Sequence, residues 1–499
     1  MRWELDWLDN RARLSPNKIA VIDENTNKTW TYKELNNRAA SVANWLQRRG
    51  AKKGDRIALL SPNHISCLDL LFACSKIGAI FVPLNWRLSI HELKEIIQDC
   101  SPRFIGIHLQ FKDLRDQFAY LGASCFEVGE ESYENITSLS IADNFPEDII
   151  ETDSLAMIYT GGTTGKPKGV VLSHQSILCN ATNTIISWNL TGDDVTINYL
   201  PMFHTGGLNA LSIPILLIGG TVVLGDQFNA LKTMESINHY RCTIILLVPT
   251  MYHMLIHTDE FQKNDFPTMK IFLSGAAPCP LQIYEAFQKK KLNFKEGYGL
   301  TEAGPNNFYI SPEDAQVKRG SVGKPMLFNQ IKLIKLDGQE AGANEVGELC
   351  IKGKHAFSYY WNHEQATTET LRDGWVQTGD LAKRDEDGFF YIVGRKKDMI
   401  ITGGENVYPL EIEHWLADHP AIDEVAVVGL PDEKWGERVA AFLVLKDSFL
   451  LDVEDLKAYC EAKLGKYKIP KQFTILEELP KTHVGKIDKK VLKEMSMQM

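Results

Sequence analysis

The fold is decided by the stretch Tyr159-Thr160-Gly161-Gly162-Thr163-Thr164-Gly165-Lys166-Pro167-Lys168-Gly169. Apolar residues stand directly before it, at 155–158, and directly after it, at 170–172, which predicts a strand, a tight loop and a second strand. Glycines let a backbone adopt positive φ and approach a ligand closely, and successive N–H groups in such a loop form a nest for an anion. With its threonine hydroxyls and its lysines, the loop suits a polyphosphate.

Two better-known phosphate loops do not match this stretch. A Walker A loop requires a glycine, four residues and then Gly-Lys followed by Ser or Thr, whereas Pro167 follows Lys166 here and Thr160 occupies the first glycine position. The dinucleotide pattern G-x-G-x-x-G opens a helix, and no helix is expected at this point. On composition alone, a glycine-rich hairpin turn without any ligand remains open.

The order of the residues resembles the phosphate-binding loop of adenylate-forming enzymes: acyl-CoA synthetases, aryl-CoA ligases, luciferases and peptide-synthetase adenylation domains. The family usually has a serine where this chain has Gly161, so one hydroxyl donor is absent. The resemblance implies nucleotide contacts from the following residues of the loop: Thr160, Gly161, Gly162, Thr163, Thr164, Gly165 and Lys168.

Composition limits the classes of protein to consider. A chain of 499 residues is expected to form two or more domains, and 44% hydrophobic with 24% charged residues is typical of a globular protein. The net charge of −10 implies no general affinity for nucleic acid. The nine scattered cysteines form no C-x-x-C pair, which argues against a zinc site or a disulfide framework and for a reducing compartment.

The expected location follows from the same survey. The sequence has no signal-peptide pattern and no apolar run of the roughly 20 residues that span a bilayer, so we expect a cytoplasmic protein without a transmembrane segment. Peripheral membrane contact stays open, as does the choice between a monomer and a homodimer. The expected partner is a small carboxylic acid and no nucleic acid.

Strand and helix patterns alternate through the first part of the chain. Thr31 and Glu34 form a capping-box pattern that opens a helix ending near Gly50. Apolar strand patterns at 57–60 and 79–82 flank another helix. The alternation predicts an α/β fold, with mixed sheets covered by helices in a large N-terminal domain of several subdomains.

Two segments in the middle of the chain carry candidate ligand-binding residues. His204 lies between an apolar strand pattern and a glycine turn, where a histidine is usually structural. The resemblance instead puts His204 beside the acyl pocket and the reacting carboxylate. Gly275, Ala276 and Ala277 follow a strand pattern. Ordinary packing explains such small residues, whereas the resemblance makes them the lining of the adenine site.

A second strong signal is Gly297-Tyr298-Gly299, which is followed by Thr301 and Glu302. Its ring suits stacking on adenine, and its carboxylate suits magnesium, because Mg²⁺ favours one or two carboxylates together with phosphate oxygens. The resemblance assigns Thr301 to the phosphates and Glu302 to magnesium and makes both catalytic. Asp380 is either an ordinary turn residue after glycine or, by the resemblance, the anchor of the ribose hydroxyls.

An abrupt charged run begins at residue 394 and suggests a domain boundary. By the resemblance, Arg395 reaches the nucleotide and Lys397 is a hinge. The hinge divides an ATP- and acyl-binding domain, 1–394, from a small mobile α+β lid domain, 395–499. A basic turn without further function is the alternative.

The resemblance also implies a two-step reaction for the whole chain, which would be an ATP-dependent acid–thiol ligase with the cofactors ATP, Mg²⁺ and coenzyme A. Lys486, in a basic C-terminal loop, would bridge the acid and the α-phosphate during formation of an acyl-adenylate. Rotation about Lys397 would then remove Lys486 and bring Gly403 and Gly404 to the pantetheine tunnel. A lysine in such a loop is otherwise merely solvated.

The acid is expected to be a medium- or long-chain fatty acid, because the chain looks most like bacterial fatty acyl-CoA synthetases. No arginine or lysine is evident near the expected pocket segments, which argues against a second substrate carboxylate; these segments are Trp188, 204–209, 246–248 and Ser274. The main alternative is a hydroxycinnamate, since the residues around Glu302 are also similar to plant-type ligases and Asn306 and Asn307 could face a polar aromatic acid. An acyl-AMP ligase that charges a carrier protein and a non-catalytic nucleotide sensor are further alternatives.

Overall fold

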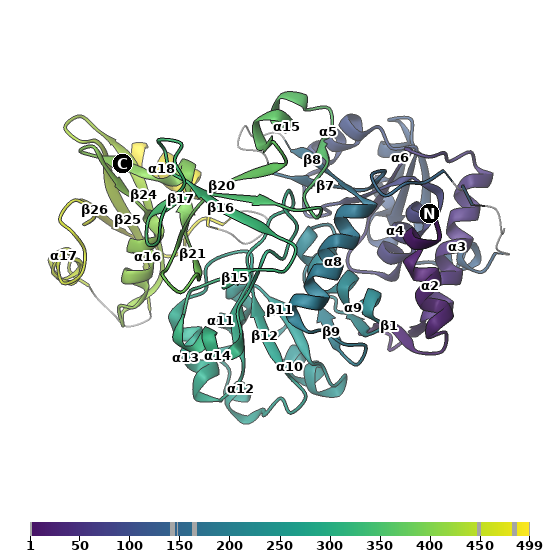
Figure 1. Cartoon of the computed structure of the whole chain (residues 1–499), viewed down its shortest axis with the longest axis horizontal. Coiled ribbons are helices and arrows are strands. Elements are labelled where there is room, and N and C mark those ends of the chain that lie inside the picture. Colours follow the sequence, from purple (N-terminus) through teal and green to yellow (C-terminus); the bar gives the residue numbers. More distant parts are fainter. Residues whose placement is uncertain are drawn as a thin grey trace.

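The computed structural model describes residues 2–139, 145–146, 148–161, 167–446, 451–481 and 487–498. The molecule is elongated, and its large N-terminal and small C-terminal domains lie at opposite ends of the long axis (Figure 1). In the described part of the chain, no helix is long and apolar enough to span a membrane. All nine cysteines are free thiols in this structure.

A seven-stranded sheet forms the N-terminal end of the large domain. Its strands, in spatial order, are β18 (Tyr359–Tyr360), β8 (Lys168–Ser173), β7 (Ser154–Thr160), β4 (Ile80–Leu84), β3 (Arg56–Leu60), β5 (Phe104–His108) and β6 (Ser124–Val128). The last five run parallel, while β8 and β18 extend one edge with antiparallel pairing. Helices α3 (Tyr32–Arg48) and α4 (Ile65–Ile77) pack on one face and α5 (Ile90–Cys100) on the other. The predicted mixed sheet covered on both faces is therefore confirmed.

The helices near this sheet begin and end where the sequence predicts. Thr31 and Glu34 form the expected capping box of α3, and Gly78 ends α4 with φ +71°, a conformation that suits glycine. Helix α8 (His174–Trp188) follows β8, and Ser173 caps its N-terminus. The other helical segments of this region are α1 (Arg2–Leu5), α2 (Trp7–Leu14), η1 (Leu109–Leu114), α6 (Arg115–Ala119) and α7 (Glu131–Thr137).

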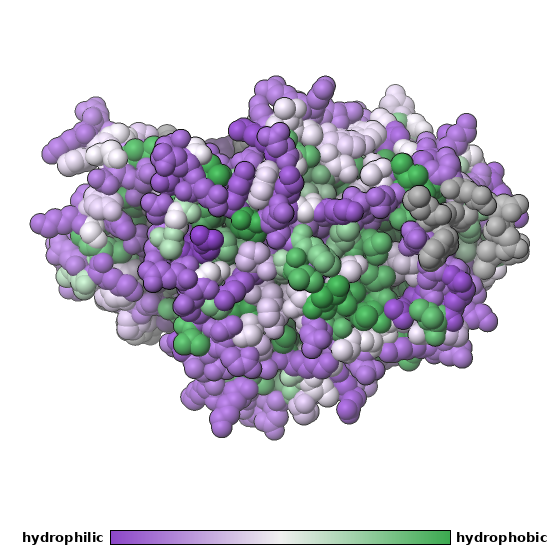
Figure 2. Space-filling model, in the orientation of Figure 1, coloured by the Kyte–Doolittle hydropathy of each residue, from purple (hydrophilic) through white to green (hydrophobic). Residues whose placement is uncertain are grey.

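Two smaller sheets complete the α/β part of the large domain. One consists of β2 (Thr29–Thr31), β1 (Ile19–Asp23), β10 (Thr221–Leu224) and β9 (Val195–Asn198), and the other is the parallel sheet β11 (Ile244–Leu247), β12 (Ile271–Ser274) and β13 (Phe294–Glu296). Their helical segments are η2 (Gly206–Ala210), α9 (Ser212–Ile218), α10 (Ala230–His239), α11 (Pro249–Ile256), α12 (Asp259–Lys263) and α13 (Leu281–Lys289). Apolar side chains gather on the surface over α8 and α9 (Figure 2). Ligands of such sheets bind beyond the carboxyl ends of the parallel strands.

An antiparallel sheet connects these layers to the small domain (Figure 1). Its strands are β16 (Gln330–Ile334), β17 (Val346–Lys352), β20 (Trp375–Arg384) and β19 (Leu371–Arg372), with β21 (Phe390–Arg395) paired to β20. The short pair β14 (Phe308–Tyr309) and β15 (Lys324–Pro325) lies nearby with α14 (Pro312–Val317) and α15 (Glu364–Thr370).

The small domain has a hydrophobic core of its own, as the sequence predicts for an α+β unit. Its sheet contains β23 (Glu405–Val407), β22 (Ile400–Thr402), β25 (Gly436–Leu445), β24 (Ile422–Asp432) and β26 (Gln472–Ile475), and its helices are α16 (Pro409–Ala417), α17 (Val453–Glu461) and α18 (Lys489–Gln498). Helix α17 ends before Leu464, although the sequence suggests a helix up to Gly465. The amide of Leu464 still bonds to the carbonyl of Cys460, so the chain continues as an isolated turn.

Candidate active site

The phosphate-loop stretch joins β7 to β8 in antiparallel register, with Thr160 opposite Lys168. This confirms the predicted strand, loop and strand, while Gly162, Thr163, Thr164 and Gly165 lie outside the described residues. A Cβ placed on Gly161 would meet no atom of the described residues within 4 Å. Within the part of the chain that the structure describes, no other side chain fills the position of the family's serine.

The loop that carries Thr301 and Glu302 is closed by short backbone contacts. A Cβ on Gly299 would lie 2.1 Å from the carbonyl oxygen of Pro305, so only glycine fits there. The amide of Leu300 donates to the carbonyl of Gly304 at 3.1 Å. The glycine of this motif is thus required by the loop itself, which presents Thr301 and Glu302 at its turn.

The Glu302 carboxylate is brought to the base of the phosphate loop. The Tyr360 hydroxyl donates to Glu302 Oε1 at 2.7 Å, and Lys168 Nζ lies 5.3 Å from the centre of the Tyr360 ring. Burial raises the pKa of Glu302, and the charges of Asp380 and Lys168 act on it in opposite directions. Tyr360 was not recognised in the sequence, because its place on the edge strand β18 beside β8 is a tertiary pairing.

Asp380 and Tyr298 form the second part of the site. The Tyr298 hydroxyl donates to Asp380 Oδ2 at 2.6 Å, and Arg395 Nε lies 3.6 Å from Asp380 Oδ1. Burial and then the charge of Asp380 raise the pKa of Tyr298, so the phenol stays protonated and holds the carboxylate. The structure therefore brings together three residues that the sequence assigned to one nucleotide.

The turn Gly275-Ala276-Ala277, which follows β12, lies next to Gly297 of the Gly297-Tyr298-Gly299 segment. A Cβ placed on Gly275 would lie 4.0 Å from the carbonyl oxygen of Gly297. Ala276 has φ +71°, which is uncommon for a residue with a side chain and marks a constrained turn. Ala276 and Ala277 are exposed, so this edge is open to a flat ligand.

His204 lies in the loop between β9 and η2. Its ring packs against Phe203 with centroids 4.6 Å apart. A Cβ on Gly207 would lie 2.2 Å from the carbonyl oxygen of Pro201, so glycine is required where the chain turns back. Beside this loop, a small cavity of about 10 Å³ has room for about one water.

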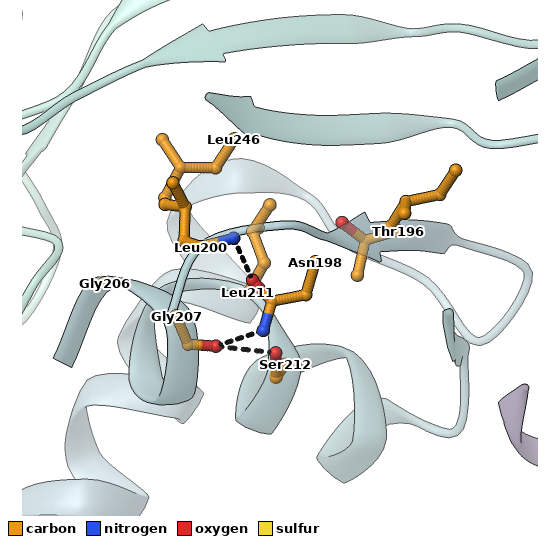
Figure 3. A pocket seen from close by; sticks show the side chains of 9 residues that line it. Thr196, Asn198, Leu200, Gly206, Gly207, Leu211, Ser212 and Leu246 are labelled. Atoms are coloured by element: carbon orange, nitrogen blue, oxygen red, sulfur yellow. Dashed lines mark hydrogen bonds between the residues drawn. The ribbon is translucent and has the colours of Figure 1, made fainter. Parts of the chain in front are cut away.

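The walls of this cavity come from β9, η2 and β11 (Figure 3). The side chains of Asn198 and Ser212 both donate to the carbonyl of Gly207, at 2.8 and 2.9 Å. Leu246 of β11 closes the opposite side. The loop that carries His204 is therefore held rigidly against the parallel sheet.

The residues predicted to form the hinge and the loop at the pantetheine tunnel, Lys397, Gly403 and Gly404, are all exposed. Lys397 is exposed in the short helix η3 (Lys396–Asp398), and neighbouring Lys396 is paired with Glu348 at 2.7 Å. Gly403 and Gly404 form the turn between β22 and β23, with φ +59° and +85°. Lys486 lies outside the described residues.

A cavity of about 290 Å³ separates the small domain from the antiparallel sheet. Asn406 and Tyr408 line it on one side, and residues of β16, β17 and β20 line it on the other. The strand that follows Gly403 and Gly404 thus borders a space between the domains.

Two expectations about the acid pocket need revision. The expectation that no lysine lies near the pocket segments is wrong, because Lys295 Nζ lies 4.5 Å from the ring of Trp188. Asn306 and Asn307, which were expected to face a polar aromatic acid, are buried and form hydrogen bonds within the protein instead. The Asn306 amide donates to Thr184 and to the carbonyl of Ala210, and the Asn307 amide donates to the carbonyl of Gly304.

The donor set fits magnesium shared with a nucleotide. Among the described residues, no group of three or more His, Cys, Asp or Glu side chains could hold a metal ion by itself. Glu302 is a single half-buried carboxylate beside the phosphate loop. Because Mg²⁺ is commonly bound by one or two carboxylates and phosphate oxygens, this site matches a metal that arrives with its nucleotide.

Comparison with known proteins identifies the family. A family model described as AMP-binding enzyme matches residues 8–361, and a model described as AMP-binding enzyme C-terminal domain matches residues 411–486. The chain belongs to the AMP-binding enzyme family. It is 37% identical to a feruloyl-CoA synthase of Amycolatopsis, with 96% of each chain covered. It is 35% identical to a long-chain-fatty-acid–CoA ligase of Mycobacterium tuberculosis, with 98% of this chain and 97% of the relative covered.

Solved structures of this AMP-binding family have the same fold. ATP-bound MatB from Rhodopseudomonas palustris superposes with a TM-score of 0.91, at 31% identity and 98% coverage of both chains. The o-succinylbenzoate CoA synthetase MenE from Bacillus subtilis, in complex with ATP and magnesium, gives a TM-score of 0.86 at 32% identity, with 97% and 98% covered. The predicted α/β fold with a large N-terminal and a smaller C-terminal domain is confirmed.

Membership of this family establishes the reaction class. The protein is an AMP-forming acyl-CoA ligase, and its cofactors are ATP, Mg²⁺ and coenzyme A. The relatives are named for different acids, from ferulate to long-chain fatty acids. The acid is therefore a question for the pocket of this chain.

Proposed function

We propose that the chain activates a carboxylic acid at the junction of the phosphate loop, the loop 299–305 and Asp380. One observation carries this proposal: the Glu302–Tyr360–Lys168 group and the Tyr298–Asp380–Arg395 group belong to one electrostatic site. The charges of Asp380 and Lys168 both act on the pKa of Glu302. A site with a carboxylate for magnesium and a carboxylate for ribose is suited to a nucleoside triphosphate.

Each predicted residue then has a role in nucleotide binding. Asp380 would accept hydrogen bonds from the ribose, and the Tyr298 ring would stack on adenine against the turn formed by Gly275, Ala276 and Ala277. Thr301, Lys168 and the backbone of the 160–165 loop would bind the phosphates. Glu302 would hold the magnesium ion, which neutralises phosphate charge in this chemistry. Arg395 would approach the nucleotide from the domain boundary.

The reaction itself needs two arrangements of the lid. First, an oxygen of the acid bonds to the α-phosphorus while the bond to the bridging oxygen breaks and pyrophosphate leaves. Lys486 would lower the repulsion between the acid and the α-phosphate at this step. Rotation about Lys397 would then withdraw Lys486 and bring the 403–406 loop to the site, where the CoA sulfur bonds to the acyl carbon and AMP leaves.

For the acid, we keep two candidates. A medium- or long-chain fatty acid is the candidate from the sequence, and the M. tuberculosis relative supports it. An aryl acid is favoured by one specific observation: two aromatic rings, Trp188 and Tyr309, lie around the amine of Lys295 in the middle of β13. The feruloyl-CoA synthase relative supports this second candidate.

The test is pyrophosphate release from ATP with a panel of acids, from acetate through palmitate to coumarate and ferulate, with and without CoA. Release that depends on an acid and rises with CoA supports the ligase reaction. Thioester formation with CoA, but not with a phosphopantetheinyl carrier domain, distinguishes it from carrier-protein charging. ATP binding without pyrophosphate release from any acid would overturn the proposal in favour of a nucleotide sensor.

A further inference from the structure

Lys295 is a buried lysine on the middle residue of β13. Only 2% of its surface is exposed. Its backbone lies beside Leu273 of β12, and Leu273 lies beside Leu246 of β11. Because neighbouring residues in register point to the same face of a sheet, Leu246, Leu273 and Lys295 form one row, which we call the leucine–lysine row.

The leucine–lysine row lies on the face of the sheet that carries the candidate acid pocket. Leu246 closes the cavity beside the His204 loop (Figure 3). A Cβ on Gly275 would lie 3.3 Å from Leu246, and a Cβ on Gly297 would lie 3.4 Å from Leu273. The row is therefore the layer directly beneath the glycines that border the nucleotide. Lys295 is two residues below Gly297, about 7 Å along the strand.

The amine of Lys295 lies against two aromatic rings and donates no hydrogen bond to any described residue. Its Nζ lies 4.5 Å from the Trp188 ring and 4.6 Å from the Tyr309 ring. Within the described residues, it has no hydrogen-bond partner. Burial lowers the pKa of Lys295 to about 7.

The other buried lysine among the described residues behaves differently. Lys76 is 3% exposed, and its Nζ donates to both oxygens of Asp6 at 2.9 and 2.8 Å. Such pairing is the rule, because an unpaired buried ammonium has a large desolvation cost. Aromatic faces attract a cation but accept no conventional hydrogen bond. Lys295 thus keeps donors available that Lys76 has already used.

We propose that Lys295 is a specificity residue of the acid pocket and donates a hydrogen bond to an oxygen at the distal end of the acid. This inference rests on the proposed ligase function and specifies its substrate class. The acid carries a phenolic oxygen or a second carboxylate at the end opposite the reacting carboxylate. Trp188 and Tyr309 keep the surroundings of the amine apolar, and few polar groups in an apolar pocket commonly set ligand orientation.

An alkyl chain fits this arrangement poorly. A fatty acid whose chain reached the Lys295 amine would exclude water from that amine and supply no acceptor. A binding site with an unpaired polar group rejects a ligand that lacks the matching atom much more strongly than it rejects a change of one methylene. The leucine–lysine row therefore favours an aryl or dicarboxylic acid over a plain fatty acid.

The experiment compares three acids of one shape: cinnamate, 4-hydroxycinnamate and 4-carboxycinnamate. The readout is kcat/KM for pyrophosphate release. We expect the wild-type protein to prefer at least one oxygen-bearing acid over cinnamate by tenfold or more. In Lys295→Met, that preference falls to about one while turnover of cinnamate is retained, and Lys295→Gln, which keeps a donor, recovers part of it.

The matched control is Lys76→Met, which also removes a buried lysine and should leave the ratio of the acids unchanged. The phenol and carboxylate arms identify which oxygen the pocket accepts. Equal kcat/KM for all three acids in the wild type, or an equal loss for all three in Lys295→Met, would overturn the inference while the ligase function stands. Failure of every acid in the wider panel would instead reject the proposed function.

Discussion

Lys295 and Glu296 are adjacent on β13 and both are buried, yet their surroundings are opposite. Glu296 accepts hydrogen bonds from the Tyr284 hydroxyl at 2.6 Å and from the Cys279 amide at 3.0 Å. The Lys295 amine lies against two aromatic rings and has no acceptor among the residues that the structure describes. Because successive side chains point to opposite faces of a strand, one charge enters a closed network and the other enters the candidate pocket. Completed hydrogen bonding marks a structural group, and an incomplete set marks a group that awaits a ligand.

The two residues also have opposite linkage to pH. Burial raises the pKa of Glu296 to about 7, so the native state retains a proton that the unfolded chain releases at lower pH. Stability from Glu296 therefore falls as pH rises from its ordinary pKa to about 7. Burial lowers the pKa of Lys295 to about 7. Its destabilising effect is complete below about 7 and fades as pH rises toward the ordinary lysine pKa.

The largest effect is expected at Glu296, the residue of the pair whose hydrogen bonds are complete. Glu296→Ala leaves the Tyr284 hydroxyl and the Cys279 amide without their acceptor, and each unsatisfied buried donor costs about 1–3 kcal/mol. We expect a loss of about 3 kcal/mol in the free energy of unfolding, larger at pH 5 than at pH 8, measured by urea denaturation. The folded fraction should still release pyrophosphate. A loss below about 1 kcal/mol would show that this network does not stabilise the fold.

The next largest effect is expected at Glu302, a half-buried carboxylate that accepts a hydrogen bond from Tyr360 and still has lone pairs to bind a metal ion. Glu302→Gln should lower kcat/KM for pyrophosphate release by about 100-fold, the typical loss for one electrostatic group at a reacting centre. The melting temperature should change little. Tyr360→Phe is the matched positioning variant, and it should raise the Mg²⁺ concentration needed for half-maximal rate. An unchanged Mg²⁺ requirement in both variants would remove Glu302 from the metal site.

Lys295→Met tests the other residue of the pair through stability. Replacing an unpaired buried charge by an apolar side chain of similar volume should stabilise the protein by about 1–4 kcal/mol. The gain should be greatest below pH 7 and should shrink toward pH 10, because Lys295 is neutral there. Urea denaturation at pH 6 and pH 10 checks this. A gain independent of pH would show that burial does not shift the pKa of Lys295 between the unfolded and the folded chain.

Lys486 provides a test that separates the two half-reactions. Lys486→Ala should lower acyl-adenylate formation by at least tenfold, or about 1.4 kcal/mol of barrier. Thioester formation from supplied acyl-adenylate should survive, because the lid has rotated by then. Lys481→Ala is the control from the same loop, since Lys481 is paired with Glu424 at 2.6 Å. Equal loss in both half-reactions would contradict the two arrangements of the lid.

The smallest effect is expected at Gly161, where the chain lacks the hydroxyl of its family. An added Cβ meets no atom of the described residues within 4 Å, so Gly161→Ser should change the free energy of unfolding by less than about 0.5 kcal/mol. A new hydrogen bond to phosphate of about 0.5–1.5 kcal/mol should lower the KM for ATP by about two- to tenfold. An increased KM would mean that the serine is not accommodated in this loop.

Much of the fold could be read from local patterns. The capping box at Thr31, the end of α4 at Gly78 and the limits of α8 all follow from interactions within a few residues. The end of α17 is harder to predict: the helix stops at Glu461, before the nearest glycine, Gly465, because a helix end also depends on packing. The candidate nucleotide residues were also recognisable, since each lies in a short motif beside an apolar strand.

The sequence by itself determined the motifs, their order and the α/β alternation, because these depend on residue types at short spacing. Only the tertiary structure decided which side chains meet across long distances: Tyr360 with Glu302, and Trp188 and Tyr309 with Lys295. It also decided that the Asn306 side chain is hydrogen-bonded inside the protein, whereas the Lys295 amine has no hydrogen-bond partner among the described residues. The physical reason is that burial and hydrogen-bond satisfaction belong to the packed neighbourhood, and a strand of three residues carries no local signal of which face will meet a ligand.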